Sequence, residues 1–317
     1  MPSILPKVLV TLPFPVSHLA PLEDMVEFVR PDTGVAPMSR AEVLERISDC
    51  EALISQGELR VDAELLDAAP KLKMVANAAM GIDNLDLGEL RKRNIVASNT
   101  PDAFAQSTAD HTMGLLLAVT RRLVETDKFV RTGEWAKRGM EPLRWESTLA
   151  GGKTLGIIGY GRIAKMVERR AQAFDMNVIH TRSQPSDDPN FRSLDDLLSE
   201  SDFVIVLVPL TERTKHLVNR ESLSKMKSGS FLINVARGKV MDEAAVVEAL
   251  KNGHLAGAAF DVFEEEPIVN EELFSMSNVV LTPHIAGATR EERKRGRLEA
   301  AENVARFFRG EDLLYPV

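Results

Sequence analysis

The sequence predicts an α/β protein with two lobes, each built around a parallel sheet. Strand-like apolar runs alternate with segments of helical periodicity along the whole chain, which is the pattern of parallel α/β architecture. A glycine-rich turn at residues 159–164 joins one of these strands to the helix that follows it. The 317 residues, 44% of them hydrophobic, suffice for two domains with separate cores.

The first lobe begins with a strand over Lys7–Leu12. Ser39 and Glu42 form a capping box, in which each side chain accepts a hydrogen bond from the other residue's backbone N–H group. A helix is therefore expected from this box to about Asp49. Three further strands complete the α/β unit, over Ala52–Ser55, Lys73–Ala76 and Ile95–Asn99.

One long amphipathic helix is expected over Ala103–Val130, where it joins the first lobe to the second. Its apolar run Met113–Val119 indicates burial on more than one side. The core of a domain and an interface between subunits fit this run equally well.

The second lobe is expected to hold six strands, near 154–159, 177–181, 203–208, 230–236, 256–262 and 279–282. With helices between most of them, these strands form a doubly wound sheet. The last helix, Thr289–Arg309, is expected to return to the first lobe. The predicted domains are therefore residues 1–100 with 287–317, and residues 101–286, with ligands in a cleft between them.

The glycine turn is typical of a dinucleotide site of the Rossmann type. Gly159 permits the sharp turn, Gly161 lets the backbone approach a pyrophosphate, and the small Ala164 keeps helix and strand close. Arg162 and Ile163 open the helix, whose N-terminal N–H groups are donors to phosphate. Residues 101–286 are thus predicted to bind a dinucleotide, which leaves the smaller domain to bind the substrate.

The residue after the next strand predicts which dinucleotide binds. Such sites place Asp or Glu on the ribose 2′-hydroxyl about 20 residues after the turn, whereas an arginine there accommodates a 2′-phosphate. Here the strand Asn177–Thr181 is followed by Arg182 and Ser183. A guanidinium on the phosphate favours NADP(H) over NAD(H) by roughly ten- to a hundredfold, so NAD(H) is the weaker alternative.

Composition limits the classes of partner. The formal net charge of −8 argues against nucleic acid or an anionic membrane surface as the main partner, so arginines must meet an anionic substrate. Cys50 is the single cysteine and is expected to be buried, and no Cys/His cluster has metal-ligand spacing. We therefore expect a cytoplasmic protein without a metal site or a membrane-spanning segment.

Three successive strand ends of the second lobe are followed by charged or titratable side chains. Arg237 follows one strand, the acidic segment Asp261–Pro267 follows the next, and His284 follows the third. Hydride transfer from NADPH to a 2-oxo acid needs a cation for the carboxylate and carbonyl groups, a proton donor for the developing alkoxide, and an acid that keeps this donor protonated. Arg237, His284 and an acid of the middle segment can fill these roles.

The chain resembles the D-isomer-specific 2-hydroxyacid dehydrogenase family over nearly its whole length. Four motifs carry the resemblance, in order: G-Y-G-R-I-A, N-V-A-R-G, D-V-F-E-E-E-P and L-T-P-H-I-A-G. The resemblance implies that Arg237 binds the substrate, that His284 is the general acid in reduction, and that Glu266 is its partner. It also implies that Asp261 holds the nicotinamide carboxamide.

The resemblance implies further site residues. In the first domain, the loop with Met80 and Gly81 is similar to the family's substrate loop, which often reads Gly-Val-Gly and binds the substrate carboxylate through backbone N–H groups. Thr108 resembles a residue at the nicotinamide-side phosphate. Trp145 resembles an aromatic that reaches the substrate pocket, and packing within the hinge is the alternative that its position favours. The expected cofactor-binding residues are Thr108, Gly159, Gly161, Arg162, Ile163, Arg182, Ser183, Ala236, Asp261 and Gly287.

With Arg182 in place of the usual acid, the chain most resembles the NADP(H)-using glyoxylate/hydroxypyruvate reductases within this family. The expected activity is the reduction of glyoxylate and hydroxypyruvate to D-2-hydroxy acids, and a homodimer is implied. Two alternatives stay open. One is another D-2-hydroxyacid dehydrogenase, acting on 2-ketogluconate, phenylpyruvate or phosphoglycerate, and the other is a nucleotide-sensing protein similar to the corepressors that share this fold.

Overall fold

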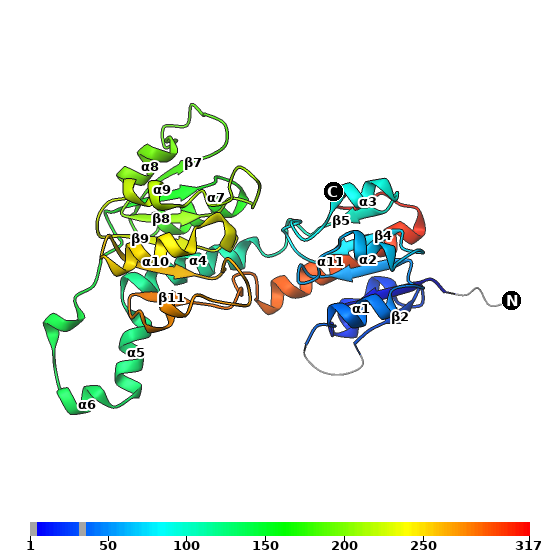
Figure 1. Ribbon diagram of the computed structural model, residues 1–317, viewed down its shortest axis with the longest axis horizontal. Helices are drawn as coiled ribbons and strands as arrows, with labels where there is room; N and C mark the ends of the chain where they lie inside the picture. Colours follow the sequence, from blue (N-terminus) through cyan, green and yellow to red (C-terminus); the bar gives the residue numbers. More distant parts are fainter. Residues whose placement is uncertain (1–4, 32–35) are drawn as a thin grey trace. The chain divides into compact units, whose positions relative to one another are not determined.

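The computed structural model describes residues 5–31 and 36–317 of the chain. The chain forms two compact units (Figure 1). Unit 1 extends to Phe104 and resumes at Ala288, and unit 2 is Ala105–Gly287. The sequence predicts these boundaries at residues 100/101 and 286/287.

Unit 1 contains a parallel sheet in the order β2-β1-β3-β4-β5. This is the flavodoxin-like order, in which the chain reverses its direction of winding between β1 and β3. Its strands are β1 (Lys7–Val10), β2 (Glu27–Val29), β3 (Ala52–Ser55), β4 (Met74–Asn77) and β5 (Val96–Ser98). The sequence patterns predict all of these strands except β2, a three-residue edge strand.

Helices cover both faces of this sheet. Its helices are α1 (Arg40–Arg46), α2 (Ala63–Asp67), α3 (Leu87–Lys92) and α11 (Arg290–Arg309), with short 3-10 turns η1 (Val16–His18) and η2 (Ala20–Leu22). Leu9 packs into the cluster with α1–α3, whereas its neighbours Val8 and Val10 pack into the cluster with α11. Successive side chains of a strand point to opposite faces, so both faces of this sheet are buried, as parallel sheets require.

The predicted capping box at Ser39 is confirmed, because Ser39 Oγ accepts from Glu42 N–H while the Glu42 carboxylate accepts from Ser39 N–H. The helix ends at Arg46, earlier than the expected Asp49. The chain turns there, and the N–H of Cys50 donates to the carbonyl of Ile47 at 2.9 Å. Cys50 is buried as expected, and burial raises the pKa of its thiol to about 11.

Unit 2 contains a parallel sheet in the order β11-β10-β9-β8-β6-β7. Its strands are β6 (Thr154–Ile158), β7 (Asn177–Thr181), β8 (Phe203–Val206), β9 (Ser230–Asn234), β10 (Leu255–Phe260) and β11 (Val279–Leu281). A parallel bridge between His180 and Phe191 continues the sheet beyond β7. Counting Phe191 as a third strand gives the Rossmann order, in which the direction of winding reverses between β6 and β8.

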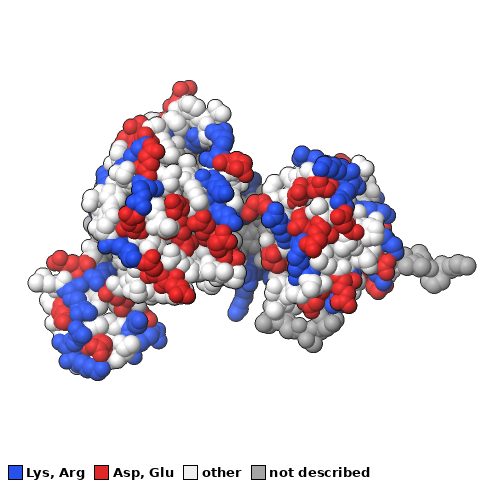
Figure 2. Space-filling view, viewed as in Figure 1, with Lys and Arg blue, Asp and Glu red and all other residues white. Residues whose placement is uncertain are grey.

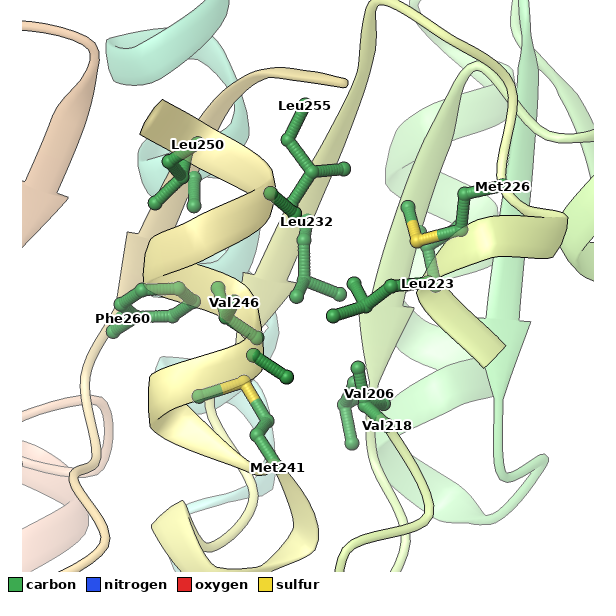
Figure 3. Close-up of a cluster of buried hydrophobic side chains, with 14 of the residues drawn as sticks. Val206, Val218, Leu223, Met226, Leu232, Met241, Val246, Leu250, Leu255 and Phe260 are labelled. Atoms are coloured by element: carbon green, nitrogen blue, oxygen red, sulfur yellow. The ribbon is translucent and has the colours of Figure 1, made fainter. Parts of the chain in front are cut away.

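One face of this sheet packs against α8 (Leu194–Glu200), α9 (Arg220–Lys225) and α10 (Glu243–Lys251). Figure 3 shows this cluster, in which Leu223 and Val246 of the helices meet Leu232 of β9. The opposite face packs against α4 (Ala105–Thr120) and α7 (Arg162–Gln172). The predicted doubly wound sheet is therefore present, with a buried layer on each side.

The long helix expected over Ala103–Val130 is two helices, α4 and α5 (Leu123–Arg131). The break lies at Arg122, whose backbone is left-handed with φ of 55°. The guanidinium of Arg122 donates to the carbonyl of Arg144 at 2.7 Å and to the Glu125 carboxylate. Contacts with a distant segment therefore end a helix that the local periodicity continues.

An arm of helices extends from the body of unit 2, formed by α5, α6 (Glu134–Arg138) and the 3-10 turn η3 (Pro142–Trp145) (Figure 1). Short 3-10 turns η4 (Gly238–Val240) and η5 (Glu271–Ser275) complete the unit. Acidic and basic side chains are interspersed over the face of the units shown in Figure 2, and Lys and Arg are frequent over the arm. Across residues 5–31 and 36–317, no helix combines the length and apolar character needed to cross a membrane.

Candidate active site

The side chains expected to do chemistry follow three adjacent strands of unit 2. Arg237 follows β9, Glu266 follows β10 and His284 follows β11. Because β9, β10 and β11 are neighbouring parallel strands, their carboxyl ends lie at one edge of the sheet. Ligands of doubly wound sheets bind at this edge.

His284 and Glu266 form a close pair. His284 Nδ1 lies 2.7 Å from Glu266 Oε2, while the other oxygen of Glu266 accepts from the backbone N–H of Phe263 at 3.0 Å. The His284 side chain is half exposed, with 50% of its surface accessible. The pair uses Nδ1, so Nε2 is the nitrogen left to exchange a proton with a ligand.

The loop that carries His284 is held by Asp261. His284 has a left-handed backbone, with φ of 52°, and its N–H donates to the carbonyl of Asp261 at 2.8 Å. The Asp261 carboxylate is fully buried and accepts hydrogen bonds from Thr282 Oγ1 at 2.6 Å and from the N–H groups of Ile285 and Ala286 at 2.8 Å each. Asp261 thus fixes an unusual backbone conformation at the histidine.

The electrostatics of the pair favour a protonated histidine. The hydrogen bond to Glu266 raises the pKa of His284, against burial and the positive charge of Arg237, which lower it. Burial would raise the pKa of Glu266, but the hydrogen bond and charge of His284, the N–H of Phe263 and the charge of Arg237 hold it below its ordinary value. Each partner therefore stabilises the charged form of the other.

Arg237 is held close to this pair by its own loop. Asn234, at the end of β9, accepts from the N–H of Ala236 at 2.9 Å and donates to the carbonyl of Arg237 at 3.0 Å. The next residue, Gly238, packs directly on the backbone of Phe263. The arginine loop and the loop that carries Glu266 therefore touch at a position where a side chain would not fit.

The glycine turn lies at the carboxyl end of β6, beside the point where the winding reverses. Gly159 has φ of 96°, and a Cβ there would lie 2.7 Å from Val208 Cγ1. A Cβ at Gly161 would meet no heavy atom within 4 Å. Gly161 caps α7, whose first residues are Arg162 and Ile163. The turn therefore leaves open space at a helix N-terminus, where a pyrophosphate group fits.

Arg182 and Ser183 are exposed on the loop that follows β7. The guanidinium of Arg182 donates to the Ser186 hydroxyl of the same loop. Thr108 is buried in α4, whose Asp110 accepts a hydrogen bond at 2.7 Å from Arg170 of α7, the helix of the glycine turn. Ala236 and Gly287 belong to the loops of Arg237 and His284.

The predicted substrate loop belongs to unit 1. The carbonyl groups of Ala79, Met80 and Gly81 accept hydrogen bonds from Thr100 N–H, Asn99 Nδ2 and Asn77 Nδ2, at 3.0, 2.8 and 2.8 Å. Among the described residues, the N–H groups of Met80 and Gly81 have no such partner. The loop is therefore rigid on its carbonyl side and offers two donors.

Trp145 lies on the arm of unit 2. Its ring packs against Phe129, with centroids 4.8 Å apart, and the guanidinium groups of Arg122 and Arg144 lie 5.2 and 5.0 Å from its centre. The Trp145 side chain is therefore held by packing within the arm. In the described part of the chain, no group of three His, Cys, Asp or Glu side chains could hold a metal ion.

A clamp that the sequence patterns do not predict holds the loop around Glu266, and Glu243 supplies it. The carboxylate of Glu243, at the start of α10, accepts from the N–H groups of Glu264 and Asn270 at 3.1 and 3.0 Å. Glu264 in turn accepts from the N–H of Glu243, and its carboxylate lies 2.6 Å from His216 Nε2. These contacts span 21 or more positions along the chain, so no local pattern announces them.

Comparison with known proteins agrees with this geometry. The family described as "D-isomer specific 2-hydroxyacid dehydrogenase, NAD binding domain" matches residues 113–286. The glyoxylate reductase of Thermococcus onnurineus is 46% identical over 314 residues, which cover 96% of this chain and 94% of that protein. The glyoxylate reductase of Pyrococcus furiosus is 44% identical over 314 residues, 96% of this chain and 93% of that protein.

Solved structures extend the likeness to the fold. The TT0316 protein of Thermus thermophilus has a TM-score of 0.91 and 40% identity, covering 98% of this chain and 99% of that one. The NADPH-dependent glyoxylate/hydroxypyruvate reductase of Sinorhizobium meliloti, solved with NADP and malonate, has a TM-score of 0.86 and 35% identity, covering 98% and 96%. The fold, the paired His284 and Glu266, and these relatives together show that the chain belongs to the D-isomer-specific 2-hydroxyacid dehydrogenase family.

Proposed function

We propose that this D-2-hydroxyacid dehydrogenase reduces glyoxylate and hydroxypyruvate to glycolate and D-glycerate, with NADPH as its cofactor. The observation that carries the proposal is the His284–Glu266 pair, with Arg237 close enough for its charge to act on both groups. The names of the Thermococcus and Pyrococcus relatives support glyoxylate as a substrate, and the name of the Sinorhizobium enzyme supports glyoxylate, hydroxypyruvate and NADPH.

The residues divide the work of substrate binding and proton transfer. The substrate carboxylate binds to the N–H groups of Met80 and Gly81 and to the guanidinium of Arg237, whose fork geometry suits it. Bound NADPH supplies the hydride that reduces the carbonyl carbon. Nε2 of protonated His284 donates its proton to the carbonyl oxygen, and Glu266 stabilises the imidazolium until that step. In oxidation the same nitrogen accepts the proton.

The cofactor fits the residues of unit 2. The open space at Gly161 and the N–H groups of Arg162 and Ile163 suit the pyrophosphate, with Thr108 on the nicotinamide side. Arg182 and Ser183 bind the 2′-phosphate, and their exposed side chains are free of any carboxylate hydrogen bond among the described residues. The remaining proposed contacts are Ala236, Asp261 and Gly287. NAD(H), which has no 2′-phosphate, binds more weakly.

Asp261 acts first as a positioning residue. Both of its oxygens already accept hydrogen bonds that order the loop of His284. Oδ1 accepts from both Thr282 and Ile285, whereas Oδ2 accepts only from Ala286 among the described residues, so the carboxamide contact that we propose uses the remaining lone pair of Oδ2 in this buried group.

We infer a homodimer that forms through the arm. Several large apolar side chains of the arm are at least half exposed, among them Leu123, Val124, Trp135, Met140 and Leu143. Trp135 and Met140, together with Phe129 and Trp145 of the same arm, line an open pocket of about 290 Å³. A cluster of exposed apolar side chains is typical of an interface, and a second copy on the arm would place Trp145 near a subunit boundary. Light scattering is expected to give twice the mass of the chain, and Met140→Glu with Leu143→Glu is expected to give monomers.

A substrate screen tests the activity. NADPH oxidation is followed with glyoxylate, hydroxypyruvate, pyruvate, phenylpyruvate and 2-ketogluconate, and the series is repeated with NADH. The expected result is the highest kcat/KM for glyoxylate or hydroxypyruvate with NADPH. A higher kcat/KM for phenylpyruvate or 2-ketogluconate would assign the chain to another branch of the family. NADPH binding without reduction of any of these acids would favour the corepressor-like alternative.

A further inference from the structure

Arg297 of α11 is a cation in an unusual setting. Its guanidinium lies over the ring of Phe14, 4.5 Å from the ring centre, and Nε donates to Gln56 Oε1 at 3.4 Å. Among the described residues, no carboxylate lies within salt-bridge distance of it. Arg295, Arg306 and Arg309 of the same helix each pair with a glutamate. A partly buried arginine normally has such a partner.

The charged groups around Arg297 are of the same sign. Burial and the charge of Arg293 lower the pKa of Arg297, while burial and the charges of Arg297 and Lys294 lower the pKa of His18. His18 Nδ1 is buried and has no hydrogen-bond partner in the described part of the chain. Glu58, a carboxylate on the loop of Gln56, accepts instead from Thr11 Oγ1 and from the N–H of Gln56. The cluster therefore holds a guanidinium with no carboxylate partner among the described residues, next to a histidine whose neutral form is favoured and whose buried Nδ1 is unused.

The cluster lies at the substrate-loop edge of unit 1. Phe14 and His18 follow β1, Gln56 follows β3, and Met80 follows β4, and these three strands are parallel neighbours. Gly57, next to Gln56, lies against Ala79, because a Cβ at Gly57 would be 3.5 Å from the Cβ of Ala79. One residue thus separates the Gln56 contact of Arg297 from the loop that we propose binds the substrate carboxylate.

We propose that Arg297, with His18 and Gln56, binds a second anionic group of the substrate, at the end of the molecule away from its 2-oxo acid group. The ligand class is a 2-oxo acid with a distal carboxylate or phosphate, such as oxaloacetate or 3-phosphohydroxypyruvate. The guanidinium presents two NH2 groups that no described residue uses, and these match two oxygens of such an anion. This inference rests on the proposed function, because it places the 2-oxo acid group on the Met80–Gly81 loop.

The proposed site would distinguish substrates by whether they carry a second anionic group that can bind Arg297. Glyoxylate has no group that could reach Arg297, so its reduction does not depend on this residue. Hydroxypyruvate offers a neutral hydroxyl, which is a weaker partner for a guanidinium than a carboxylate or phosphate. We therefore expect the effect of Arg297 to increase from glyoxylate to hydroxypyruvate to the dianionic acids.

The test compares kcat/KM across these substrates with NADPH. For Arg297→Met, we expect KM for oxaloacetate and 3-phosphohydroxypyruvate to rise about 10- to 100-fold, the effect of losing a hydrogen bond between charged groups. The values for glyoxylate are expected to stay within about twofold of wild type. Arg297→Lys keeps the charge and is expected to recover part of the loss. Arg295→Met removes a cation that pairs with Glu299 on the same helix, and this variant is expected to leave KM unchanged for every substrate.

The possible outcomes are distinct. An equal loss for glyoxylate and for the dianionic acids in Arg297→Met would overturn the anion site and assign the residue to folding, as would a loss that Arg297→Lys does not reduce. Unchanged KM for every substrate would overturn it as well. If wild-type protein reduced none of these acids, the proposed function itself would be contradicted, which the glyoxylate reaction reports separately from the effect of Arg297.

Discussion

Gly238 packs on the peptide group of Phe263 so closely that a Cβ on the glycine would lie 1.9 Å from both the carbonyl carbon and the carbonyl oxygen of Phe263. Arg237 directly precedes this glycine, and Phe263 donates its N–H to Glu266. The close approach therefore fixes Arg237, which we propose binds the substrate, relative to Glu266, which raises the pKa of His284. Backbone meets backbone here, which makes the relationship insensitive to side-chain motion.

Gly238→Ala is expected to displace one of these loops, because no flexible side chain can move to admit the methyl group. We predict a lower melting temperature and a large loss of kcat/KM, since a small displacement of positioning groups costs about 100-fold in rate. Gly114→Ala is the matched control. Gly114 lies within α4 and a Cβ there meets no heavy atom within 4 Å. This variant is expected to gain up to about 1 kcal/mol of stability at unchanged activity. Equal behaviour of the two variants would contradict the tight contact.

Glu266→Gln is expected to change the pH dependence of reduction. Glu266 raises the pKa of His284, so protonated His284 persists at higher pH in wild type. In the proposed reaction, reduction uses the protonated form, so kcat/KM is expected to fall as the pH rises through this raised pKa. Replacing the carboxylate with an amide removes the charge and lowers the pKa. We predict that the alkaline fall of kcat/KM moves to lower pH. An unchanged profile would show that Glu266 does not set the pKa of His284.

Arg182→Asp tests the choice of cofactor. The aspartate would repel a 2′-phosphate and could accept a hydrogen bond from a 2′-hydroxyl. We predict that KM for NADPH rises about 10- to 100-fold and that NADH becomes competitive. Arg169→Ser removes an exposed cation elsewhere on α7 and is expected to leave the preference unchanged. Unchanged preference in Arg182→Asp would show that other residues hold the phosphate.

The sequence predicts those features that depend on local patterns. All strands but β2, the capping box at Ser39 and the Gly159 turn are coded within a few residues, and adjacent strand ends bring Arg237, Glu266 and His284 to one edge. Other features depend on contacts between distant segments. The break at Arg122 follows from a hydrogen bond to Arg144, and the clamp of Glu243 on the loop of Glu264 joins residues 21 positions apart. Local periodicity carries no record of such partners.

The stack beneath the predicted phosphate loop is another feature that the sequence conceals. Tyr160 and His180 stack with ring centres 3.5 Å apart, and His180 bridges to Phe191 at the far end of the loop that begins with Arg182. The pattern of the glycine motif leaves the residue at position 160 free to vary. The stacking of Tyr160 follows from His180 in β7, the strand that lies next to the turn.

We propose that His284, kept protonated by Glu266, donates the proton that completes reduction. The most direct test is steady-state NADPH oxidation by His284→Ala with saturating NADPH and glyoxylate, together with NADPH binding followed by fluorescence. We predict a fall in kcat of about 10² to 10⁴, with NADPH affinity unchanged, because the imidazole serves proton transfer rather than cofactor binding. Turnover equal to that of wild type would contradict the claim.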